Sequence, residues 1–187
     1  MNFPPDCVAL ADYLRTATRR AHRGLDHHPI LNALLQTDLT RAAYARALAA
    51  LYAPQQALEA WLADFVPLTE LPPRLPDLAV DLAELGCDPH PLATPLPAWS
   101  SSISVRLGCA YVIEGANLGG AVIARQLPDG LPRRFFAGAG GEPRWQRFWL
   151  FASQFGITSA QDMCSTAQAA QECFAWYRAH LDGCVQP

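Results

Sequence analysis

Apolar positions along this chain recur with the spacing of helices. Between about residues 6 and 26, leucine and alanine return every three or four positions, and Asp6, after two prolines, is placed to cap a helix. No segment alternates between apolar and polar residues over five or more positions, and no Asn-Gly or Asp-Gly pair joins two β-branched runs. The pattern predicts an all-α fold.

Prolines, glycines and capping residues divide the chain into six to eight predicted helices. After the first, they cover about 29–36, 40–66, a short helix stopped by Gly86, 99–127, the aromatic segment RWQRFWLFASQF, and a last helix ending near residue 181. Thr40 is a cap, Pro54 is expected to kink its helix, and Thr158 with Gln161 matches a capping box. The segment RRFFAGAGGEP is predicted to be a flexible connection.

Length and composition indicate one globular unit. The chain has 187 residues, of which 51% are hydrophobic and 17% charged. A chain of this length buries about 70% of its unfolded surface around a single core. We therefore expect one domain spanning residues 1–187.

Charge narrows the function classes. The net charge is −3, and no basic run is interleaved with aromatic residues, which argues against nucleic acid as the main partner. All 14 basic residues are arginine, so Schiff-base chemistry through lysine is excluded. Any bound anion must be held by arginine, backbone amides or hydroxyl groups.

Cysteine usage and hydropathy indicate a cytoplasmic protein. The six cysteines show no zinc-binding spacing and are expected to be reduced and mostly buried, and the N-terminus does not resemble a signal peptide. The longest apolar stretch, 103–127, is interrupted by Arg106, Glu114 and Arg125, so we do not expect it to span a membrane.

His22 is the histidine with the clearest chemical context. It follows Leu14 and Thr18 at steps of four, which predicts that it shares the apolar stripe of the first helix rather than its solvent-exposed face. Asp26 lies one turn further on, where a carboxylate can orient the ring directly or through water and raise its basicity as a metal ligand. The spacing alone equally fits a half-buried core histidine beside a capping aspartate.

The other four histidines give weaker signals. His27 and His28 stand at a helix end and are expected to be solvated charges, and His90 and His180 have no partner at ligand spacing. No Glu-x-x-His pair occurs, which excludes a helical di-iron carboxylate site.

The segment YVIEGANLGG, residues 111–120, contains glycines inside a helical pattern, where each costs roughly 1 kcal/mol relative to alanine. At 100° per residue, Gly108, Gly115 and Gly119 fall within about 40° of one another and form a strip. The strip permits either close packing of another helix or contact of a flat ligand with bare backbone. The adjacent pair Gly119-Gly120 favours the ligand.

Two segments together, LRTATRRAHRGLDHHPILNALL at 14–35 and YVIEGANLGGAVIARQL at 111–127, resemble the haem oxygenase family, especially its bacterial members. In that family the first helix carries the proximal histidine within a pattern close to L-R-x-x-T-x-x-x-H-x-x-L-[ED]. Here the pattern is occupied by Leu14, Arg15, Thr18, His22, Leu25 and Asp26. The stretch RRFFAGAGGEPRWQRFW at 133–149 resembles the phenylalanine-glycine segment that follows the distal helix.

The resemblance implies cleavage of haem to biliverdin, carbon monoxide and ferrous iron, with haem as substrate and as the cofactor that activates O2. It implies that haem lies between the first helix, where His22 binds the iron, and a distal helix containing Gly115, Gly119 and Gly120. An external electron donor, either a reductase or a ferredoxin, and in some bacteria a phytochrome that accepts biliverdin, are the implied partners.

Three positions depart from the family pattern. Ala116 stands where animal-type members have an aspartate that organises water, which leaves Asn117 as the candidate for that task. Asp26 replaces the more usual glutamate, a shortening that leaves room for a water between it and His22. Ala139 stands where an aromatic residue between glycines is expected.

Haem propionates require cations, and Arg15, seven residues before His22 on the same face, is the best candidate. Arg19, Arg144 and Arg147 are weaker ones. Two alternatives to the enzyme remain at this point. One is a protein of the same fold that binds or stores haem without cleaving it, and the other is an all-α interaction module whose glycine strip only packs helices.

Overall fold

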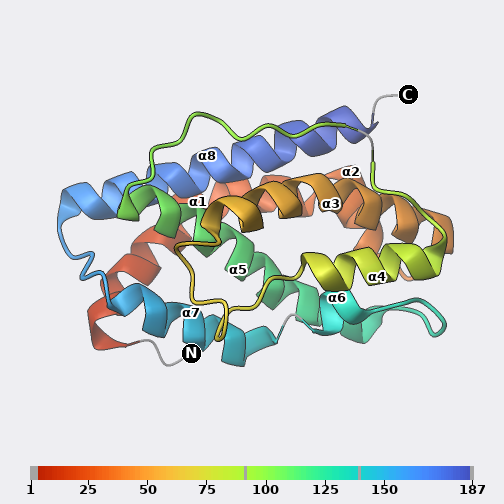
Figure 1. The fold of residues 1–187 in the computed structure, drawn as a ribbon, viewed down its shortest axis with the longest axis horizontal. Coiled ribbons are helices and arrows are strands. Elements are labelled where there is room, and N and C mark those ends of the chain that lie inside the picture. Colours follow the sequence, from red (N-terminus) through yellow and green to blue (C-terminus); the bar gives the residue numbers. More distant parts are fainter. Residues whose placement is uncertain (1–3, 91, 139, 186–187) are drawn as a thin grey trace.

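The computed structural model describes residues 4–90, 92–138 and 140–185, and these residues form helices and connections without a strand (Figure 1). The described helices are α1 (Val8–Asp26), α2 (Pro29–Asn32), α3 (Arg41–Leu62), α4 (Leu75–Leu85), α5 (Ile103–Gln126), α6 (Arg134–Ala137), α7 (Gly141–Ser153) and α8 (Ala160–Val185), with 3-10 turns at Pro5–Cys7 and Ala33–Leu35. The predicted all-α class is confirmed.

Helix α5 runs diagonally through the middle of the molecule, between α8 and α1 on one side and α6 and α7 on the other (Figure 1). Helices α1 and α8 run parallel and in fixed register. The side chain of Gln171 donates to the carbonyl of Ala17 at 2.8 Å, and Arg178 donates to that of Gly24 at 3.4 Å. Helix α8 is thus the common support of α1 and α5.

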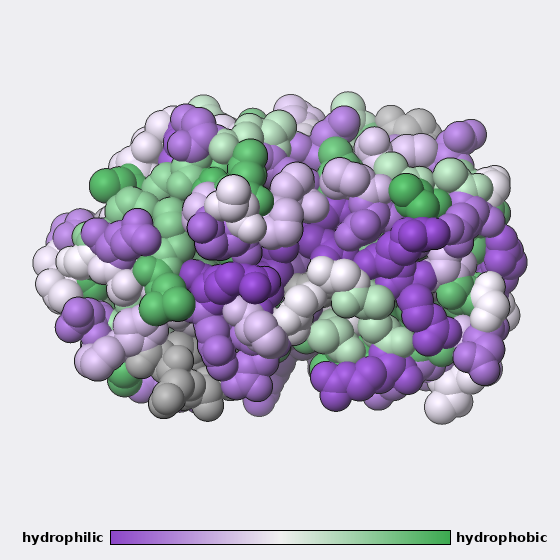
Figure 2. All heavy atoms as spheres, turned by 60° about the horizontal axis from the view of Figure 1, so that its bottom comes forward, coloured by the Kyte–Doolittle hydropathy of each residue, from purple (hydrophilic) through white to green (hydrophobic). Residues whose placement is uncertain are grey.

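Two hydrophobic clusters make up the described core. The first joins α1, α5, α7 and α8 and includes Leu14, Leu107 and Trp149, while the second joins α3, α4 and α6 and includes Tyr44 and Phe136. Helix α5 takes part in both clusters. On the face that carries α6 and α7, hydrophilic residues cover the middle, and apolar residues gather toward the end with the α7–α8 connection (Figure 2).

Residues next to the helix ends cap or stop several helices, and those at Thr40 and Gly86 do so as the sequence predicts. Thr40 and Ser102 cap α3 and α5 by accepting from the backbone amides of Ala43 and Val105 at 3.1 and 3.4 Å. Gly86 ends α4 with φ of 66°, a left-handed conformation that glycine adopts without steric cost. Helix α3 contains Pro54 and continues to Leu62.

Other predicted boundaries are wrong by one or more residues. Asp6 does not cap α1, because the 3-10 turn that begins at Pro5 leads directly into the helix without an extended cap residue. The α8 cap is Ser159 rather than Thr158, since the Ser159 hydroxyl accepts from the amide of Asp162 at 3.0 Å. The segment predicted to be flexible contains α6, whose ends are held by distant side chains described below.

Helix α8 continues past Gly183 to Val185, further than predicted. A Cβ at Gly183 would lie 2.7 Å from the Leu92 side chain, so the glycine there serves close packing rather than helix termination. Three of the six free thiols, those of Cys7, Cys109 and Cys173, are buried, whereas Cys164 is exposed.

Among the described helices, α5 alone is long and apolar enough to span a membrane by length and composition. In the fold, 56% of its most apolar window is buried. It is packed against α8 and α7, which is the position of a core helix.

Candidate haem site

The His22 side chain lies on the surface of α1 and is 59% exposed. Its Nδ1 is 2.8 Å from a carboxylate oxygen of Asp26, so the contact is direct and leaves no room for an intervening water. The ring also stands edge-on to Phe174 of α8, with centroids 5.8 Å apart. Nε2 has no hydrogen-bond partner among the described residues. The imidazole is therefore held at one nitrogen and open at the other, which is the arrangement of an oriented metal ligand.

The glycine strip of α5 divides into a closed part and an open part. A Cβ at Gly108 would lie 2.4 Å from the carbonyl oxygen of Thr166 and 2.9 Å from the Ala169 side chain, both in α8. At Gly115 the nearest described atoms belong to the Trp145 ring, 3.8 Å away, and at Gly119 the described chain has no atom within 4 Å. The backbone is thus bare at Gly119 and nearly so at Gly115.

Tyr111 of α5 lies near Thr18 and Arg15 of α1. Burial raises the pKa of the Tyr111 hydroxyl, and the neighbouring Thr18 side chain and the charge of Arg15 lower it. On each helix the next turn on the same face carries the candidate group: His22 four residues after Thr18, and Gly115 four residues after Tyr111.

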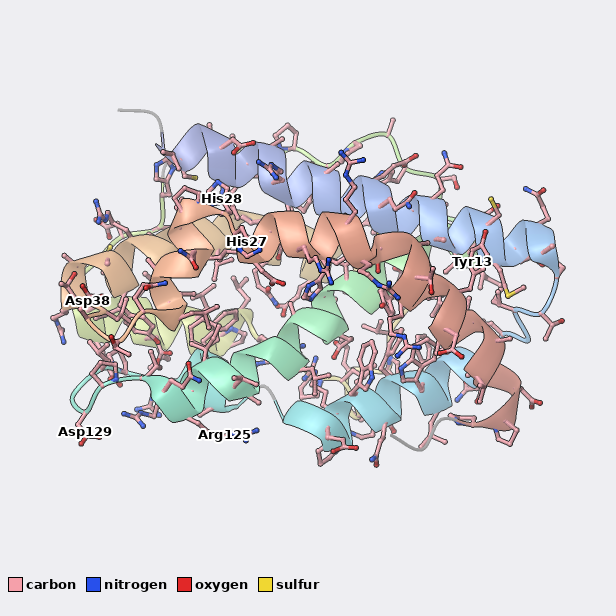
Figure 3. All side chains as sticks on the ribbon, turned by 180° about the vertical axis from the view of Figure 1, so that it is seen from behind. Tyr13, His27, His28, Asp38, Arg125 and Asp129 are labelled. Carbon is pink, nitrogen blue, oxygen red and sulfur yellow. The ribbon has the colours of Figure 1, made fainter. Side chains whose placement is uncertain are left out.

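Beyond that contact the two helices separate. Both pack against α8, and within the described chain they make little contact with each other. Figure 3 shows α1 and α5 diverging toward the end of the molecule where Asp38 and Arg125 are labelled. His22 of α1 and the bare backbone of α5 belong to the stretch over which these two helices diverge, here called the opening. An available ligand atom and a surface without side chains would together suit a flat ligand.

Asn117 is not part of this opening. It lies about 200° around α5 from Gly115 and is buried. Its amide donates to a Glu114 carboxylate oxygen at 3.2 Å. Ala116 is exposed, and Gly120 is buried. Of the predicted distal residues, Gly119 is open, Gly115 faces the Trp145 ring of α7 at 3.8 Å, and Asn117 lies on the opposite side of α5.

A buried ion pair lies behind the distal helix. Glu114 accepts from Arg144 of α7 in two hydrogen bonds of 2.5 and 2.7 Å, and the two side chains are 5% and 4% exposed. Arg144 also donates to the carbonyl of Pro72 at 2.8 Å. Arg144, a weaker propionate candidate, is therefore fully engaged in the interior.

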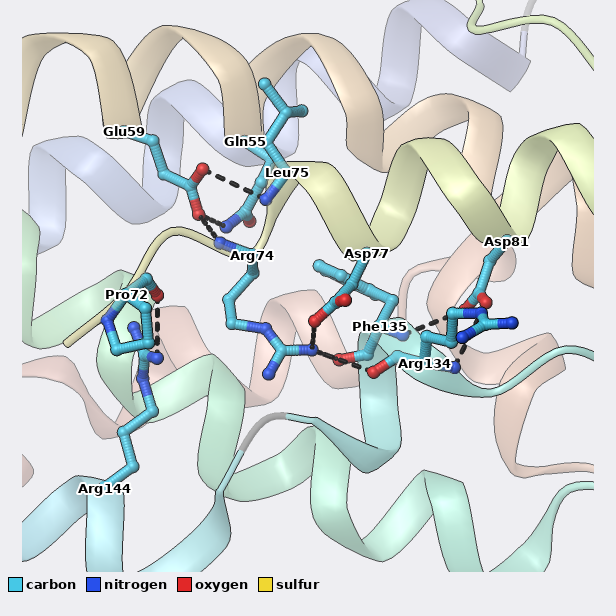
Figure 4. A network of polar contacts seen from close by, with 10 residues as sticks. All are labelled: Gln55, Glu59, Pro72, Arg74, Leu75, Asp77, Asp81, Arg134, Phe135 and Arg144. Atoms are coloured by element: carbon cyan, nitrogen blue, oxygen red, sulfur yellow. Dashed lines mark hydrogen bonds and ion pairs between the residues drawn. The ribbon is translucent and has the colours of Figure 1, made fainter. Parts of the chain in front are cut away.

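A second network holds α6, which follows the distal helix (Figure 4). Asp81 accepts from the amides of Arg134 and Phe135 at 3.1 and 2.9 Å and so caps the start of α6. Arg74 donates to the carbonyl oxygens of the same two residues. Glu59 in turn accepts from the amide of Arg74. Burial raises the pKa of the Asp81 carboxyl, and the two amides partly offset this.

These roles of Glu114, Arg144, Arg74 and Asp81 are not predicted by the sequence pattern. The one available signal was a glutamate inside a long apolar helix, immediately before a glycine. Its partner is 30 residues away, and nothing local identifies it.

The remaining candidates are distributed as follows. Arg15 is 72% exposed and paired with Asp12 at 3.0 Å, and Arg19 is exposed. His27 is exposed, but the expectation for His28 is wrong: it is buried and caps α2, with Nδ1 accepting from the amide of Ile30 at 3.3 Å. Ala139 lies outside the described residues.

This all-α architecture, with an oriented histidine opposite a bare glycine helix, defines a helical protein suited to a flat, metal-containing ligand. Comparison with known proteins identifies the family. Residues 8–87 match the heme oxygenase family model. The heme oxygenase of Xanthomonas campestris pv. campestris (strain 8004) is 38% identical over 120 residues, which cover 61% of this chain and 70% of that protein. The chain belongs to the haem oxygenase family.

Solved structures share the fold. The NO- and CO-bound heme oxygenase from Neisseria meningitidis superposes with a TM-score of 0.69 at 20% identity, over 94% of this chain and 91% of that one. Heme oxygenase-1 from the cyanobacterium Synechocystis sp. PCC6803, in complex with heme, gives 0.67 at 17% identity, over 94% and 92%. The heme oxygenase from Leptospira interrogans also gives 0.67, at 16% identity, over 93% and 98%.

Proposed function

We propose that this chain is a haem oxygenase that binds haem between α1 and α5 and cleaves it to biliverdin, carbon monoxide and ferrous iron, using O2 and external electrons. One observation supports the assignment of the site: the open nitrogen of His22 lies on α1 and the bare backbone of Gly119 on α5, on the stretch over which these two helices diverge. When bound, haem supplies the iron and the porphyrin edge on which the oxidation takes place.

His22 acts as the proximal ligand. The Asp26 carboxylate at Nδ1 selects the tautomer in which that nitrogen carries the proton, which leaves the Nε2 lone pair free for the iron. The edge-on contact with Phe174 restricts rotation of the ring. The residues of this chain thus aim one nitrogen and leave the opposite haem face to α5.

The distal face is shaped by what α5 lacks. Gly115 and Gly119 present no side chain to the opening, so O2 and the porphyrin edge meet backbone rather than a wall of side chains. Ala116 has no polar group with which to hold water, and the Asn117 amide is engaged by Glu114. We assign the ordering of water to backbone groups of the bare turn. Asn117 then acts through the position of α5, and Gly120 adds freedom to bend.

Arg15 is the proposed propionate partner. It lies two turns before His22 on the same face, and its only described ion pair, with Asp12, is exposed and therefore weak. If Arg15 exchanged its partner Asp12 for a haem propionate, it would lose a weak ion pair and gain a charge-assisted hydrogen bond.

The remaining partners follow from the chemistry. Cleavage requires electrons that the protein itself does not supply, so a reductase or a ferredoxin is the proposed donor. A bacterial phytochrome is a proposed acceptor of biliverdin. Six free thiols support a cytoplasmic location.

Titration of the purified protein with hemin, followed by reduction, tests the function. We expect a Soret band of a histidine-ligated haem and, after addition of ascorbate or a reductase, conversion to a biliverdin spectrum with release of carbon monoxide. A band that persists under reductant would favour the haem-storing alternative. Absence of a band would favour the interaction module.

The ligand assignment has its own test. His22→Ala should abolish the histidine-ligated spectrum, and His27→Ala, which changes an exposed histidine at the end of the same helix, should retain it. Loss in the control but not in His22→Ala would overturn the assignment.

A further inference from the structure

Two consecutive residues of α7 hold α5 at its first distal glycine. Arg144 binds Glu114, the residue before Gly115, through two hydrogen bonds of 2.5 and 2.7 Å. The ring of Trp145 lies 3.8 Å from the point where a Cβ of Gly115 would be. The ring is itself fixed by stacking on Phe148, with centroids 5.3 Å apart. The turn of α5 around Gly115 is therefore contacted from α7 on two sides.

The ion pair is anchored beyond α7. Arg144 donates to the carbonyl of Pro72 in the connection before α4, and Asn117 of α5 donates to Glu114. A small cavity of about 30 Å³ borders the pair and is lined by Glu59, Ile113 and Asn117 among others. Three segments that are distant in sequence, α5, α7 and the connection before α4, thus meet at one buried ion pair.

One turn further along α5 this support ends. Gly119 has no atom of the described chain within 4 Å of its would-be Cβ, and it is followed by a second glycine. A helix interrupted by two glycines, of which Gly119 has no described neighbour from another element at its would-be Cβ and Gly120 is buried, bends more easily than the turn before it.

We infer that the Glu114–Arg144 pair is a positioning device for the distal helix, which fixes the turn that contains Gly115 and confines bending to Gly119 and Gly120. This inference rests on the proposed function for its consequence at haem: the fixed turn determines where the backbone lies over the porphyrin. Glu114 and Arg144 are positioning residues, since neither faces the opening between α1 and α5.

Stability alone is a weak reason for this pair. A buried ion pair recovers its desolvation cost only with good geometry, and replacing both partners with apolar residues of similar volume is often neutral or stabilising. The double variant Glu114→Met/Arg144→Met removes the device and leaves no unpaired buried charge. Arg144→Lys keeps the charge and gives up the two-point contact.

Hydrogen exchange of the apoprotein tests the device without haem. We expect amides at 112–118 to exchange about tenfold faster in the double variant, which corresponds to about 1.4 kcal/mol, and to a lesser degree in Arg144→Lys. Arg106→Met is the matched control. Arg106 belongs to α5, eight residues before Glu114, and this substitution breaks its ion pair with Asp64. Unchanged exchange at 112–118 in both Glu114/Arg144 variants would overturn the inference.

Spectra and products of the haem complex test the consequence. In the double variant we expect the C–O stretching band of the carbon monoxide complex to broaden and the ratio of biliverdin isomers to change, with hemin affinity within about threefold of the original. Arg144→Lys should restore part of the original ratio. An unchanged band and isomer ratio would refute the positioning role. If the unmodified protein forms no biliverdin, the proposed function fails, whereas the exchange result still decides whether the device exists.

Discussion

The two halves of α5 contain the same residue on the same face for opposite reasons. At Gly108 the absent Cβ makes room for the backbone of α8, which lies so close that even a methyl group would meet the Thr166 carbonyl at 2.4 Å. At Gly119 the described chain leaves space within 4 Å empty. The strip therefore serves close helix packing in its first half and an open surface in its second.

This difference shows why glycine spacing alone gives two answers. A strip of small residues reports that no side chain is tolerated along one face, but it does not report what comes near that face. The surroundings of the glycines differ instead: a Cβ at Gly108 would meet the Thr166 carbonyl and Ala169 of α8, whereas at Gly119 no such neighbour from the described chain lies within 4 Å. The packing partner of a glycine, which the local sequence does not reveal, separates a packing glycine from an open one.

Filling the open half should have the largest effect on activity. Gly119→Leu places a branched side chain over the proposed distal face, and we expect haem turnover to fall by about 100-fold, equivalent to about 2.7 kcal/mol. The urea midpoint of the apoprotein should not decrease, because no described atom occupies the space. Steady-state conversion of hemin to biliverdin checks the first expectation. Unaffected turnover would contradict the account of the distal face.

Filling the closed half should instead reduce stability. Gly108→Ala forces a methyl group against backbone atoms of α8, and such overpacking costs typically about 1–3 kcal/mol, occasionally more. The free energy of unfolding, from urea denaturation followed by circular dichroism, measures this cost. Among molecules that remain folded, turnover should persist. An unchanged free energy would show that α5 and α8 are less closely packed than described.

The mildest substitution of the open half should raise stability. Gly119→Ala adds a methyl group that meets no described atom, so the helix gains about 1 kcal/mol from the propensity of alanine. Gly108→Ala and Gly119→Ala are the same substitution in the same helix, and we expect them to change the free energy of unfolding in opposite directions. If both substitutions changed the free energy of unfolding in the same direction in urea denaturation, the distinction between the two halves of α5 would be lost.

The smallest expected effect concerns a comparison of two histidines, the buried His180 and the exposed His27. Burial lowers the pKa of His180, its hydrogen bond to the Ala50 carbonyl partly offsets this, and His90 lowers the pKa further. An unfolded histidine titrates near about 6.5. Below that pH the unfolded chain binds a proton that the folded chain excludes, so stability is complete above about pH 6.5 and falls as pH decreases.

His180→Gln should flatten this dependence by less than about 1.4 kcal/mol per pH unit, the limit for one proton. Urea midpoints at several pH values between about 5.5 and 7.5 measure it. Substitution of the exposed His27 by glutamine is the control and should leave the slope unchanged. If the His27 variant, and not the His180 variant, had the flatter pH dependence, the assignment of the effect to His180 would be wrong.

Local chemistry made much of the fold predictable. The cap Thr40 and the helix end at Gly86 depend on residues within one turn, and the structure has both as predicted. The same local arguments misplace the α8 cap by one residue, because Thr158 and Ser159 are adjacent and equally capable. They also leave out α6, since its ends are satisfied by Arg74 and Asp81 rather than by its neighbours in sequence.

The candidate site divides in the same way. The approach of Asp26 to His22 is a contact within one helical turn, so spacing predicts it. The pairing of Glu114 with Arg144, and the burial of His28 against Asp182 of α8, depend on how distant helices pack. Sequence therefore identified the candidate ligand and the bare strip, but not the residues that hold the strip in place.

The two hydrophobic clusters meet along α5 at its glycine pair. Leu118 packs against the first cluster and Ile123 against the second, so Gly119 and Gly120 fall between them. A change of about 10° at this point would carry the six residues up to Gln126 through about 1.6 Å, given a rise of 1.5 Å per residue. The part of α5 that packs in the second cluster through Ile123 and Ala124 would move with them, whereas α3 contributes to both clusters and ties one to the other. A bend at the glycine pair would therefore shift the end of α5 while α3 keeps the two parts of the core together.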